Sequence, residues 1–283
     1  MKYNKKGRVQ LYMKTRIISA TVGIALLIVT LFFKDTFLLS VVIGLLALIA
    51  GYETLKTTKT LNIIPFAVVS ALYIAAAICI TRGYIGVSYA VASTAYAILF
   101  CGCVLYSFNK VNLTSMFTAF LMVFFTTYGF SSIISILDEK FGMFLFIIVA
   151  FCSWGSDTGA YFAGRALGKH KLAPNLSPKK TVEGVIGGVL FNLILCMLFG
   201  AVYQAVNKDI QYLSFLGLII IAVTGTAVSI VGDLFASAIK RTFKIKDYGN
   251  IMPGHGGVLD RFDSTLLVSV YIYTVLQFFV LIK

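Results

Sequence analysis

The sequence predicts an all-α, polytopic transmembrane protein, and two observations lead to that fold class. The first is composition: 59% of the 283 residues are hydrophobic and only 12% are charged, with a mean hydropathy of +0.93. So few polar side chains cannot cover the surface of a water-soluble globule of this size. The second is the length of the apolar runs, which approach the roughly 20 residues that cross a bilayer as a helix.

We expect about nine membrane-spanning helices, each set by an apolar run that ends at charged or turn-forming residues. Lys34 and Asp35 follow the first run without a small-residue cleavage site, which favours a retained signal anchor over a removed signal peptide. The second run is short and the eighth is long, so the count can change by one. The predicted spans are 16–33, 36–51, 61–80, 84–106, 113–136, 141–163, 183–205, 212–239 and 264–282.

Basic residues set the predicted orientation. The chain has 24 Lys and Arg residues and a net charge of +13, and most of these residues fall in alternate connections on one side of the predicted spans. By the positive-inside rule that side is cytoplasmic. We therefore expect a multi-pass protein of the cell membrane with its N-terminus and its two basic loops, 164–182 and 240–263, in the cytoplasm. The positive charge is spread over short loops, which favours anionic substrates and membrane lipids as partners. We expect no nucleic-acid partner.

The two halves of the chain differ in polarity, which predicts a transmembrane scaffold over 1–140 and a catalytic region over 141–283. The first part is rich in Ala, Gly and Ser, which let membrane helices approach closely, and has no carboxylate inside a predicted span. All five cysteines lie in apolar spans and show neither a disulfide pairing pattern nor the spacing of a zinc site. We therefore expect each cysteine to be buried and to pack as a small hydrophobic side chain. The chemistry is expected in the second part.

The polar stretch from Gly232 to Ser264 is the strongest candidate for a site. Ser229, Asp233, Ser237 and Lys240 follow helical spacing and form a polar stripe on an apolar span. A carboxylate at mid-bilayer costs about 2.5 to 3.5 kcal/mol, so Asp233 should be paired, face a cavity or bind a cation. Cationic side chains and glycines that suit a phosphorylated ligand follow the stripe, namely Lys240, Arg241, Lys246, Gly254, Gly256, Gly257 and Arg261.

Carboxylates in this stretch leave two interpretations open. Asp233 and Asp260 can hold a hard cation such as Mg²⁺ through oxygen ligands, with Asp157 and Asp263 as further candidates. Asp263 can equally cap the final helix, and the basic residues also satisfy the positive-inside rule. His255 can orient a phosphate oxygen.

An earlier polar run, from Ser153 to Gly184, places Asp157, Tyr161 and Arg165 at successive i+4 positions. Asp157 should either pair with Arg165 or share the metal site, and the pairing is slightly favoured. In the basic loop that follows, phosphate-binding candidates are Ser177, Lys179 and Lys180, and Thr181 is placed to cap the next helix.

The later stretch resembles the signature of the phosphatidate cytidylyltransferase (CDP-diacylglycerol synthase) family. The residues that match in order and spacing are Ser237, Ile239, Lys240, Arg241, Lys246, Asp247, Gly249, Pro253, His255, Gly256, Gly257, Asp260, Arg261 and Asp263. One departure is Met252, where the family usually carries Leu, Ile or Phe. The run 156–184 is similar to a second recurrent block of the same family, so the resemblance covers about residues 150–264.

The resemblance implies a membrane enzyme that joins CTP and phosphatidic acid to give CDP-diacylglycerol and pyrophosphate, with Mg²⁺, in phospholipid biosynthesis. The family's metal-site carboxylates map onto Asp233 and Asp260. Joining two anions needs positioning and cationic stabilisation more than a protein nucleophile. The expected catalytic residues are Asp233, Asp260, Lys240, Arg241 and His255, and the expected substrate-binding residues are Ser177, Lys179, Lys180, Lys246, Gly256, Gly257 and Arg261.

Two other functions stay open. A lipid kinase or another membrane phosphotransferase uses the same metal and cations, and its nucleotide preference and released product would separate it from a cytidylyltransferase. An ion-coupled transporter would also bury Asp157 and Asp233, but its halves should be related, and the halves of this chain differ sharply. A homodimer, the acyl-chain preference and the base-reading residues are left open by the sequence.

Overall fold

A computed structural model describes residues 21–23, 25–108, 110–252, 254 and 256–283. The described chain is mostly helical, with one two-stranded sheet. In order, the elements are α2 (Phe37–Thr57), α3 (Ile64–Thr81), α4 (Tyr89–Tyr106), α5 (Leu113–Asp138), α6 (Gly142–Ala150), the π-helical turn η1 (Phe151–Gly155), α7 (Ser156–Leu167), β1 (Lys171–Ala173), β2 (Ser177–Thr181), α8 (Val182–Val206), α9 (Phe215–Thr242) and α10 (Leu259–Leu276).

The chain forms two compact units. Unit 1 comprises Met1–Ile134 and Phe243–Phe262, and unit 2 comprises Ser135–Thr242 and Asp263–Lys283. The segment Phe243–Phe262, which carries much of the signature, clusters with the N-terminal helices, so residues with a predicted chemical role occur in both units.

Seven described helical stretches are long and apolar enough to cross a membrane. They are Phe37–Thr57, Ile64–Thr81, Tyr89–Tyr106, Leu113–Asp138, Gly142–Leu167, Val182–Val206 and Phe215–Thr242. A shorter apolar helix, Thr21–Phe32, precedes them, and the predicted residues 16–20 lie outside the described chain. The helical, multi-pass character is confirmed, whereas the count of nine and the orientation of the N-terminus stay predictions.

Three element boundaries differ from the sequence predictions, with consequences for the site. Helix α2 continues past residue 51 to Thr57 and therefore contains Glu53, so the expectation of no carboxylate in a first-half span was wrong. Helix α10 begins at Leu259 and not at 264, so Asp263 lies inside the helix and does not cap it. Residues 171–173 and 177–181, predicted as loop, form an antiparallel hairpin.

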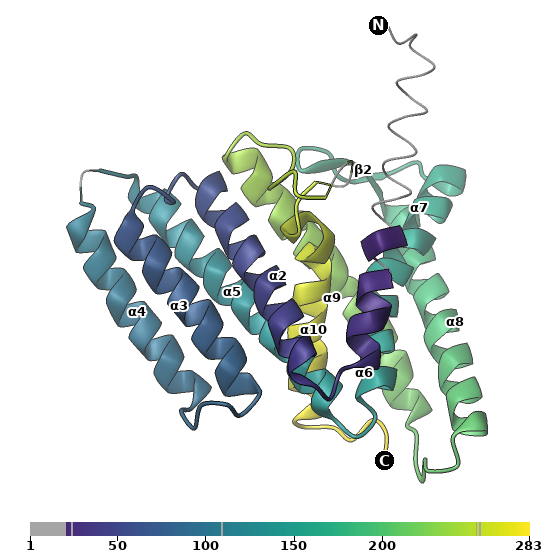
Figure 1. Cartoon of the computed structure of the whole chain (residues 1–283). Helices are drawn as coiled ribbons and strands as arrows, with labels where there is room; N and C mark the ends of the chain where they lie inside the picture. Colours follow the sequence, from purple (N-terminus) through teal and green to yellow (C-terminus); the bar gives the residue numbers. More distant parts are fainter. Residues whose placement is uncertain (1–20, 24, 109, 253, 255) are drawn as a thin grey trace, which may run out of the picture. The chain divides into compact units, whose positions relative to one another are not determined.

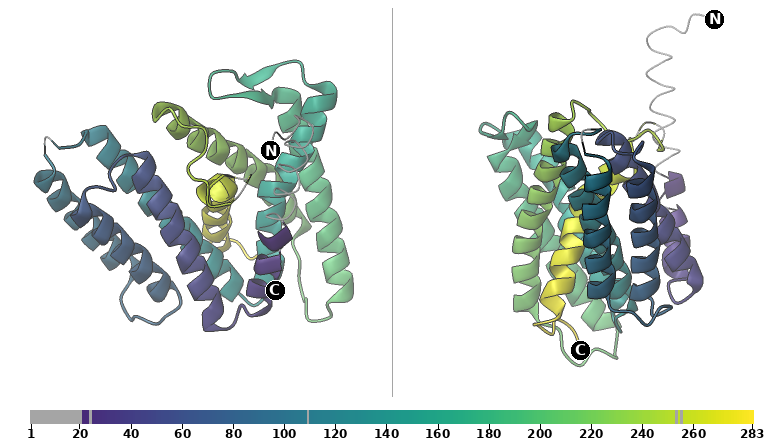
Figure 2. Two further views of the ribbon diagram at one scale, coloured as in Figure 1. Left: turned by 45° about the horizontal axis from the view of Figure 1, so that its top comes forward. Right: turned by 90° about the vertical axis from the view of Figure 1, so that its left-hand side faces the viewer.

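Aromatic side chains fill the packing between the helices of unit 1. Helix α3 lies between α2 and α4 (Figures 1 and 2). The Tyr73 ring of α3 stacks on the Tyr96 ring of α4, with centroids 4.3 Å apart, and Phe100 stacks on Phe120 of α5 at the same separation. The Tyr96 hydroxyl is 3.1 Å from the Ser70 hydroxyl, so its polar end is satisfied inside the packing.

Small and polar side chains hold the helices of unit 2. Helices α7 and α8 lie side by side, and α9 packs on α8 (Figure 2). A Cβ at Gly188 of α8 would lie 2.8 Å from the Ser156 carbonyl oxygen, so this close approach requires glycine. The buried Asn192 amide of α8 donates to the Ala222 carbonyl at 3.0 Å and the Thr226 hydroxyl at 2.8 Å on α9.

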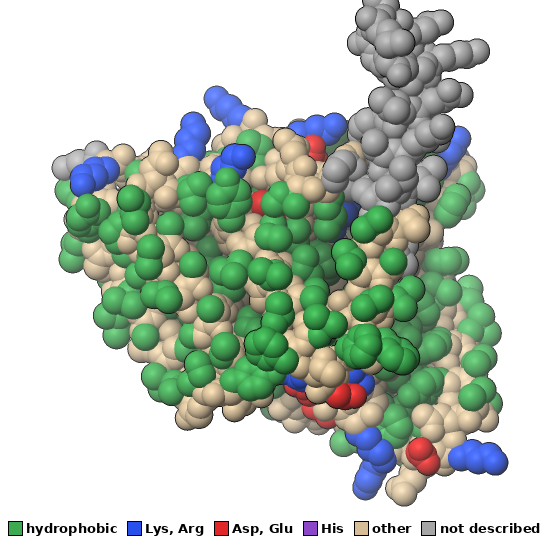
Figure 3. Space-filling view, viewed as in Figure 1, with side chains coloured by type: hydrophobic (Ala, Val, Ile, Leu, Met, Phe, Trp, Pro, Cys, Tyr) green, Lys and Arg blue, Asp and Glu red, His purple; other side chains and the backbone are tan. Residues whose placement is uncertain are grey.

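The surface supports a lipid environment for these helices. Exposed hydrophobic side chains occur along α3 and α4, including Leu72, Ile98 and Leu105. Figure 3 shows hydrophobic side chains over the middle of these two helices. All five cysteines are free, as expected, but only Cys103, Cys152 and Cys196 are buried; Cys101 is exposed, so its predicted burial was wrong.

Candidate active site

A cluster of two carboxylates and one lysine lies in unit 2. The Lys180 Nζ, on β2, is 2.7 Å from Asp233 Oδ2 on α9, and both side chains are about a quarter exposed. Asp157 of α7 is exposed and lies within electrostatic range of both groups. Charged side chains from three elements thus occur in one region of unit 2, and we call Asp157, Lys180 and Asp233 the acid–lysine cluster.

Lys179 and Lys180, which are adjacent on strand β2, differ in their exposure. Within the hairpin, Lys171 pairs with Thr181 and Ala173 with Ser177. Lys179 is exposed, whereas Lys180 is partly buried against Asp233, as expected for neighbours on opposite faces of a strand. The Thr181 hydroxyl accepts a hydrogen bond from the Gly184 N–H at 3.1 Å, so the predicted cap of α8 is confirmed.

The expected ion pair between Asp157 and Arg165 is absent from the described residues. The Arg165 guanidinium instead donates to the Tyr161 hydroxyl at 3.3 Å, one turn earlier on α7. Tyr161 and Arg165 are four residues apart on α7 and can be neighbours, whereas Asp157 and Arg165 are eight residues, or about 12 Å along the helix axis, apart. Asp157 instead lies within electrostatic range of charges on β2 and α9. The favoured pairing was therefore wrong, and Asp157 belongs to the acid–lysine cluster.

Near the end of α9, the Lys240 Nζ is 3.7 Å from Asp263 Oδ2 on α10, with both side chains largely buried. Arg241, the next residue, is exposed in the last turn of α9. These two predicted catalytic cations therefore have different surroundings. Asp263 pairs with a lysine within unit 2 and so contributes to packing between α9 and α10.

Residues 243–258 of unit 1, which we call the glycine loop, are organised by Asp260. The Asp260 Oδ2 accepts hydrogen bonds from the Tyr248 N–H at 2.7 Å and the Gly257 N–H at 3.0 Å, and Asp260 is 8% exposed. The Gly257 N–H is thus engaged within the loop, although we expected it to approach a substrate phosphate. Lys246 and Arg261 are exposed around this segment, and Gly256 adopts a φ of 90°; His255 lies outside the described residues.

Glu53 is the residue near the site that the sequence analysis missed. It lies on α2, is 1% exposed, and accepts hydrogen bonds from the Val258 and Leu259 N–H groups at 3.1 and 2.9 Å. The available signal was a single carboxylate at the end of an apolar run, which a membrane helix retains only for a partner or a function. Ending the predicted span at residue 51 removed that signal.

The described carboxylates suit Mg²⁺ better than a metal that needs many protein ligands. Among the described residues no group of three or more His, Cys, Asp or Glu side chains could hold a metal ion. Mg²⁺ usually needs only one or two carboxylates, with water and substrate phosphates as its other ligands, so Asp157 and Asp233 fit it. The Ser229 hydroxyl, one helical turn before Asp233, is buried without a hydrogen-bond partner in the described structure and is a further oxygen on the stripe. Asp233 and Asp260 belong to different units, and their sharing of one ion stays a prediction.

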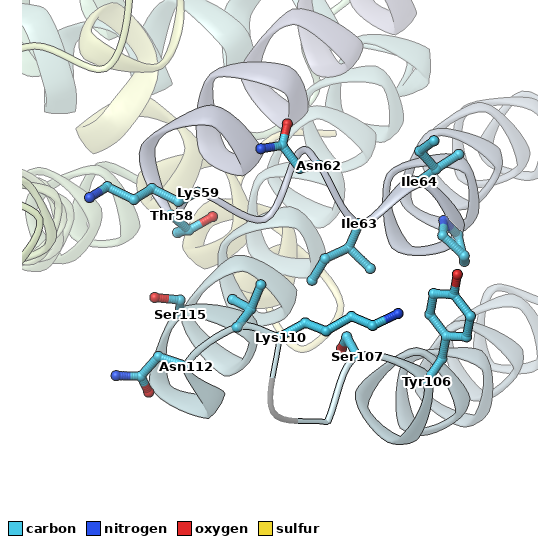
Figure 4. Close-up of a pocket in the computed structure, with 12 residues that line it drawn as sticks. Thr58, Lys59, Asn62, Ile63, Ile64, Tyr106, Ser107, Lys110, Asn112 and Ser115 are labelled. Carbon is cyan, nitrogen blue, oxygen red and sulfur yellow. The ribbon is translucent and has the colours of Figure 1, made fainter.

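A separate pocket of about 630 Å³ opens in unit 1 between the α2–α3 and α4–α5 connections (Figure 4). Its lining includes Lys59, Asn62 and Asn112, together with Lys110, which points toward Tyr106 with Nζ 4.5 Å from the ring centroid. Among the described residues that line this pocket, none has a predicted role at the site.

Comparison with known proteins gives one family. The model of the "Cytidylyltransferase family" matches residues 14–279. The phosphatidate cytidylyltransferase of Haemophilus influenzae is 44% identical over 144 residues, which are 51% of this chain and 49% of that protein. The Bacillus subtilis phosphatidate cytidylyltransferase is 43% identical over 141 residues, half of each chain. The Staphylococcus epidermidis protein of the same name is 33% identical over 273 residues, covering 90% of this chain and 96% of its own length. The first two alignments thus span about half the length of the relatives.

Proposed function

Because the chain belongs to the cytidylyltransferase family, we propose that it is a phosphatidate cytidylyltransferase, which converts CTP and phosphatidic acid to CDP-diacylglycerol and pyrophosphate. The observation that carries this proposal is the match over nearly the whole chain, both to the family model and to the S. epidermidis relative. The acid–lysine cluster and the cations near the glycine loop are the chemistry that such a reaction needs.

In the proposed reaction, a phosphate oxygen of phosphatidic acid attacks the α-phosphorus of CTP. A new phosphorus–oxygen bond forms, the bond from the α-phosphorus to the oxygen bridging to the β-phosphorus breaks, and pyrophosphate leaves with that electron pair. The lipid supplies the nucleophile, so the protein needs no covalent intermediate. Its task is to hold two anions together and to offset the charge that develops on the leaving group.

Cations from both units support this task. In unit 2 we assign Lys180, Lys240 and Arg241 to the charge of the phosphates, with Lys179 and Ser177 as further contacts from β2. In unit 1 we assign Lys246 and Arg261, beside the loop that contains Gly256 and Gly257. Arg241, Lys246, Arg261 and Lys179 are exposed, which suits side chains that meet a ligand from solution. His255 is retained as a residue that orients a phosphate oxygen.

Mg²⁺ is proposed as the cofactor, with Asp233 as its principal protein ligand. Asp157 supports this assignment because it shares the surroundings of Asp233, and the resemblance favours Asp260 as the other ligand. When bound, Mg²⁺ would neutralise phosphate charge and polarise the reacting phosphoryl group. In the acid–lysine cluster, Asp233 and Asp157 would be the metal ligands and Lys180 would be a cationic contact for nucleotide phosphate.

Membrane orientation is the remaining part of the proposal. The excess of basic residues in alternate connections favours a cytoplasmic position for residues 164–182 and 240–263 in the cell membrane, where CTP is available. Phosphatidic acid would reach the same side from the bilayer.

The reaction is tested by its products. Purified protein is incubated with phosphatidic acid, Mg²⁺ and each nucleoside triphosphate in turn, and both the lipid product and the released phosphate species are identified. We expect CDP-diacylglycerol and pyrophosphate from CTP. Release of a nucleoside diphosphate with a newly phosphorylated lipid would instead identify a lipid kinase, and the absence of any lipid product with all four nucleotides would contradict the proposal.

A further inference from the structure

Glu53 connects the N-terminal helices to the glycine loop. Its Oε1 accepts the Val258 N–H at 3.1 Å and its Oε2 accepts the Leu259 N–H at 2.9 Å. Val258 immediately precedes α10 and Leu259 begins it, so both oxygens lie at the positive end of the helix dipole. No ion pair to Glu53 occurs among the described residues, and the residue is 1% exposed. These two amides stabilise the buried carboxylate through hydrogen bonds.

Two signature glycines make room for this carboxylate. A Cβ on Gly249 would overlap Glu53 Oε1, and a Cβ on Gly257 would lie 2.6 Å from the Glu53 carboxyl carbon. Both glycines have the ordinary negative φ values that any residue adopts, since neither is among the residues with positive φ. Space for Glu53, and not backbone freedom, is thus the structural reason for glycine at these two positions.

Glu53 and Asp260 hold adjacent parts of the same backbone. Three consecutive N–H groups donate to them: Gly257 to Asp260, and Val258 and Leu259 to Glu53. Asp260 also accepts the Tyr248 N–H from the beginning of the loop. Releasing Val258 and Leu259 would therefore free the start of α10, which carries Asp260 and Arg261.

We infer that Glu53 is a positioning residue for the proposed reaction: from α2 it fixes the glycine loop and the first turn of α10, and so sets the position of Asp260. The inference rests on the proposed cytidylyltransferase function. It assigns to the N-terminal half a direct part in shaping the site, where the sequence predicts only a scaffold.

The test uses variants of the full-length protein with graded chemistry at residue 53. Glu53→Gln keeps the shape but points an amide N–H₂ at one of the two backbone donors, whereas Glu53→Asp keeps the charge and shortens the side chain. Glu139→Gln, an exposed change in the turn after α5, is the matched control. We measure kcat and KM for CTP and phosphatidic acid, and the hydrogen exchange of peptides that contain Tyr248 or residues 257–259.

For Glu53→Gln we expect kcat to fall by about 10- to 100-fold, the effect of losing a hydrogen bond to a buried charged acceptor. Exchange should accelerate in the two loop peptides while peptides of α3 and α4 stay unchanged, which a general loss of folding would not produce. Glu53→Asp should recover part of kcat, and Glu139→Gln should match the wild type. Wild-type kcat in Glu53→Gln would overturn the inference while leaving the proposed function intact.

Gly249→Ala supplies a second route if Glu53→Gln does not fold. It leaves Glu53 in place but puts a methyl group where the carboxylate lies, so we expect the same local exchange pattern and the same loss of kcat. Full activity of Gly249→Ala, or uniform acceleration of exchange throughout α2–α4 in both variants, would overturn the positioning role. Failure of the wild-type protein to form CDP-diacylglycerol would instead reject the proposed function on which the inference rests.

Discussion

The Lys180 ammonium lies 2.7 Å from an Asp233 carboxylate oxygen, joining a strand of the hairpin to α9. The sequence predicts that Lys180 neutralises substrate phosphates and that Asp233 holds a metal ion, and it does not predict their contact with each other. Because the two side chains pair directly, a substrate phosphate or a metal ion that binds here would meet the charges of Lys180 and Asp233 together. Removing one of these side chains leaves the other without its ion-pair partner in a partly buried position.

Lys180→Ala should therefore be more damaging than Lys179→Ala. We expect kcat to fall by about 100-fold or more in Lys180→Ala, in the range found when one charge-stabilising donor is lost from an active site. Lys179 is exposed and unconstrained by Asp233, so its change should mainly raise the KM for CTP. Steady-state kinetics on purified protein measure both, with the exposed Lys208→Ala as control. Equal kcat values for the two variants would contradict the distinction.

The sequence predicts the presence of the helices better than it predicts where they end. Long apolar runs predict the helices, because the bilayer requires every backbone polar group to be satisfied within them. Exact ends are less well determined: α2 keeps Glu53 because backbone amides of a distant loop satisfy its carboxylate. A contact between residues 53 and 258 leaves no periodic pattern in either segment, so only the folded structure reveals it.

The site shows the same limit. The sequence predicts chemical roles for Asp157, Lys180, Asp233 and Asp260, but not their partners. The i+4 rule correctly places Tyr161 beside Arg165. Asp157 is two turns away from Arg165 on the same helix, so the expected pairing of Asp157 with Arg165 failed. Likewise, glycines suggest phosphate binding, whereas the Gly257 N–H is engaged by Asp260.

Asp157→Asn should lower activity by roughly 100-fold, the loss typical when one charge-stabilising group is removed from an active site. The reason is that Asp157 lies within electrostatic range of Lys180 and Asp233. Arg165→Gln is the matched change, since the Arg165 contact is a surface hydrogen bond to Tyr161, and its activity should stay within about two-fold of wild type. Initial rates at saturating CTP and phosphatidic acid decide between them. Similar large losses in the two variants, as expected for partners of one ion pair, would contradict the separation of Asp157 from Arg165.

Gly232→Ala tests the packing of α9 on α10 in unit 2. A Cβ at Gly232 would lie 3.1 Å from the Ser264 Cα and 3.2 Å from the Asp263 carbonyl oxygen, both backbone atoms that cannot easily move. Overpacking of this kind costs about 1 to 3 kcal/mol, so the thermal midpoint in detergent should fall. Gly102→Ala in α4 is the control, because its Cβ would meet nothing within 4 Å and alanine favours helices. An unchanged midpoint for Gly232→Ala would contradict this packing.

The predicted orientation is tested with single cysteines placed at Lys179 and Lys244 after the five native cysteines are replaced. Both positions are exposed and lie in the segments predicted to be cytoplasmic. They should resist a membrane-impermeant maleimide in intact cells and react after permeabilisation. A cysteine at Lys208, in the connection predicted on the opposite side, should react from outside. Labelling of Lys179 or Lys244 positions in intact cells would reverse the orientation or change the number of spans.

Variants of Asp233 and Asp260 test whether both carboxylates bind the same metal ion. Asp→Asn keeps the side-chain shape and removes the charge, so each single variant should lose activity by about 100-fold or more. If both ligate the same Mg²⁺, the double variant should be scarcely worse than either single, as for groups that act as a unit. Because Asp260 also accepts two backbone N–H groups, hydrogen exchange of peptides containing Tyr248 must accompany the kinetics. Undisturbed exchange with non-additive losses and a raised Mg²⁺ requirement would support shared ligation. Multiplicative losses with accelerated exchange only in Asp260→Asn would assign Asp260 to loop organisation and leave Asp233, with Asp157, as the metal-binding pair.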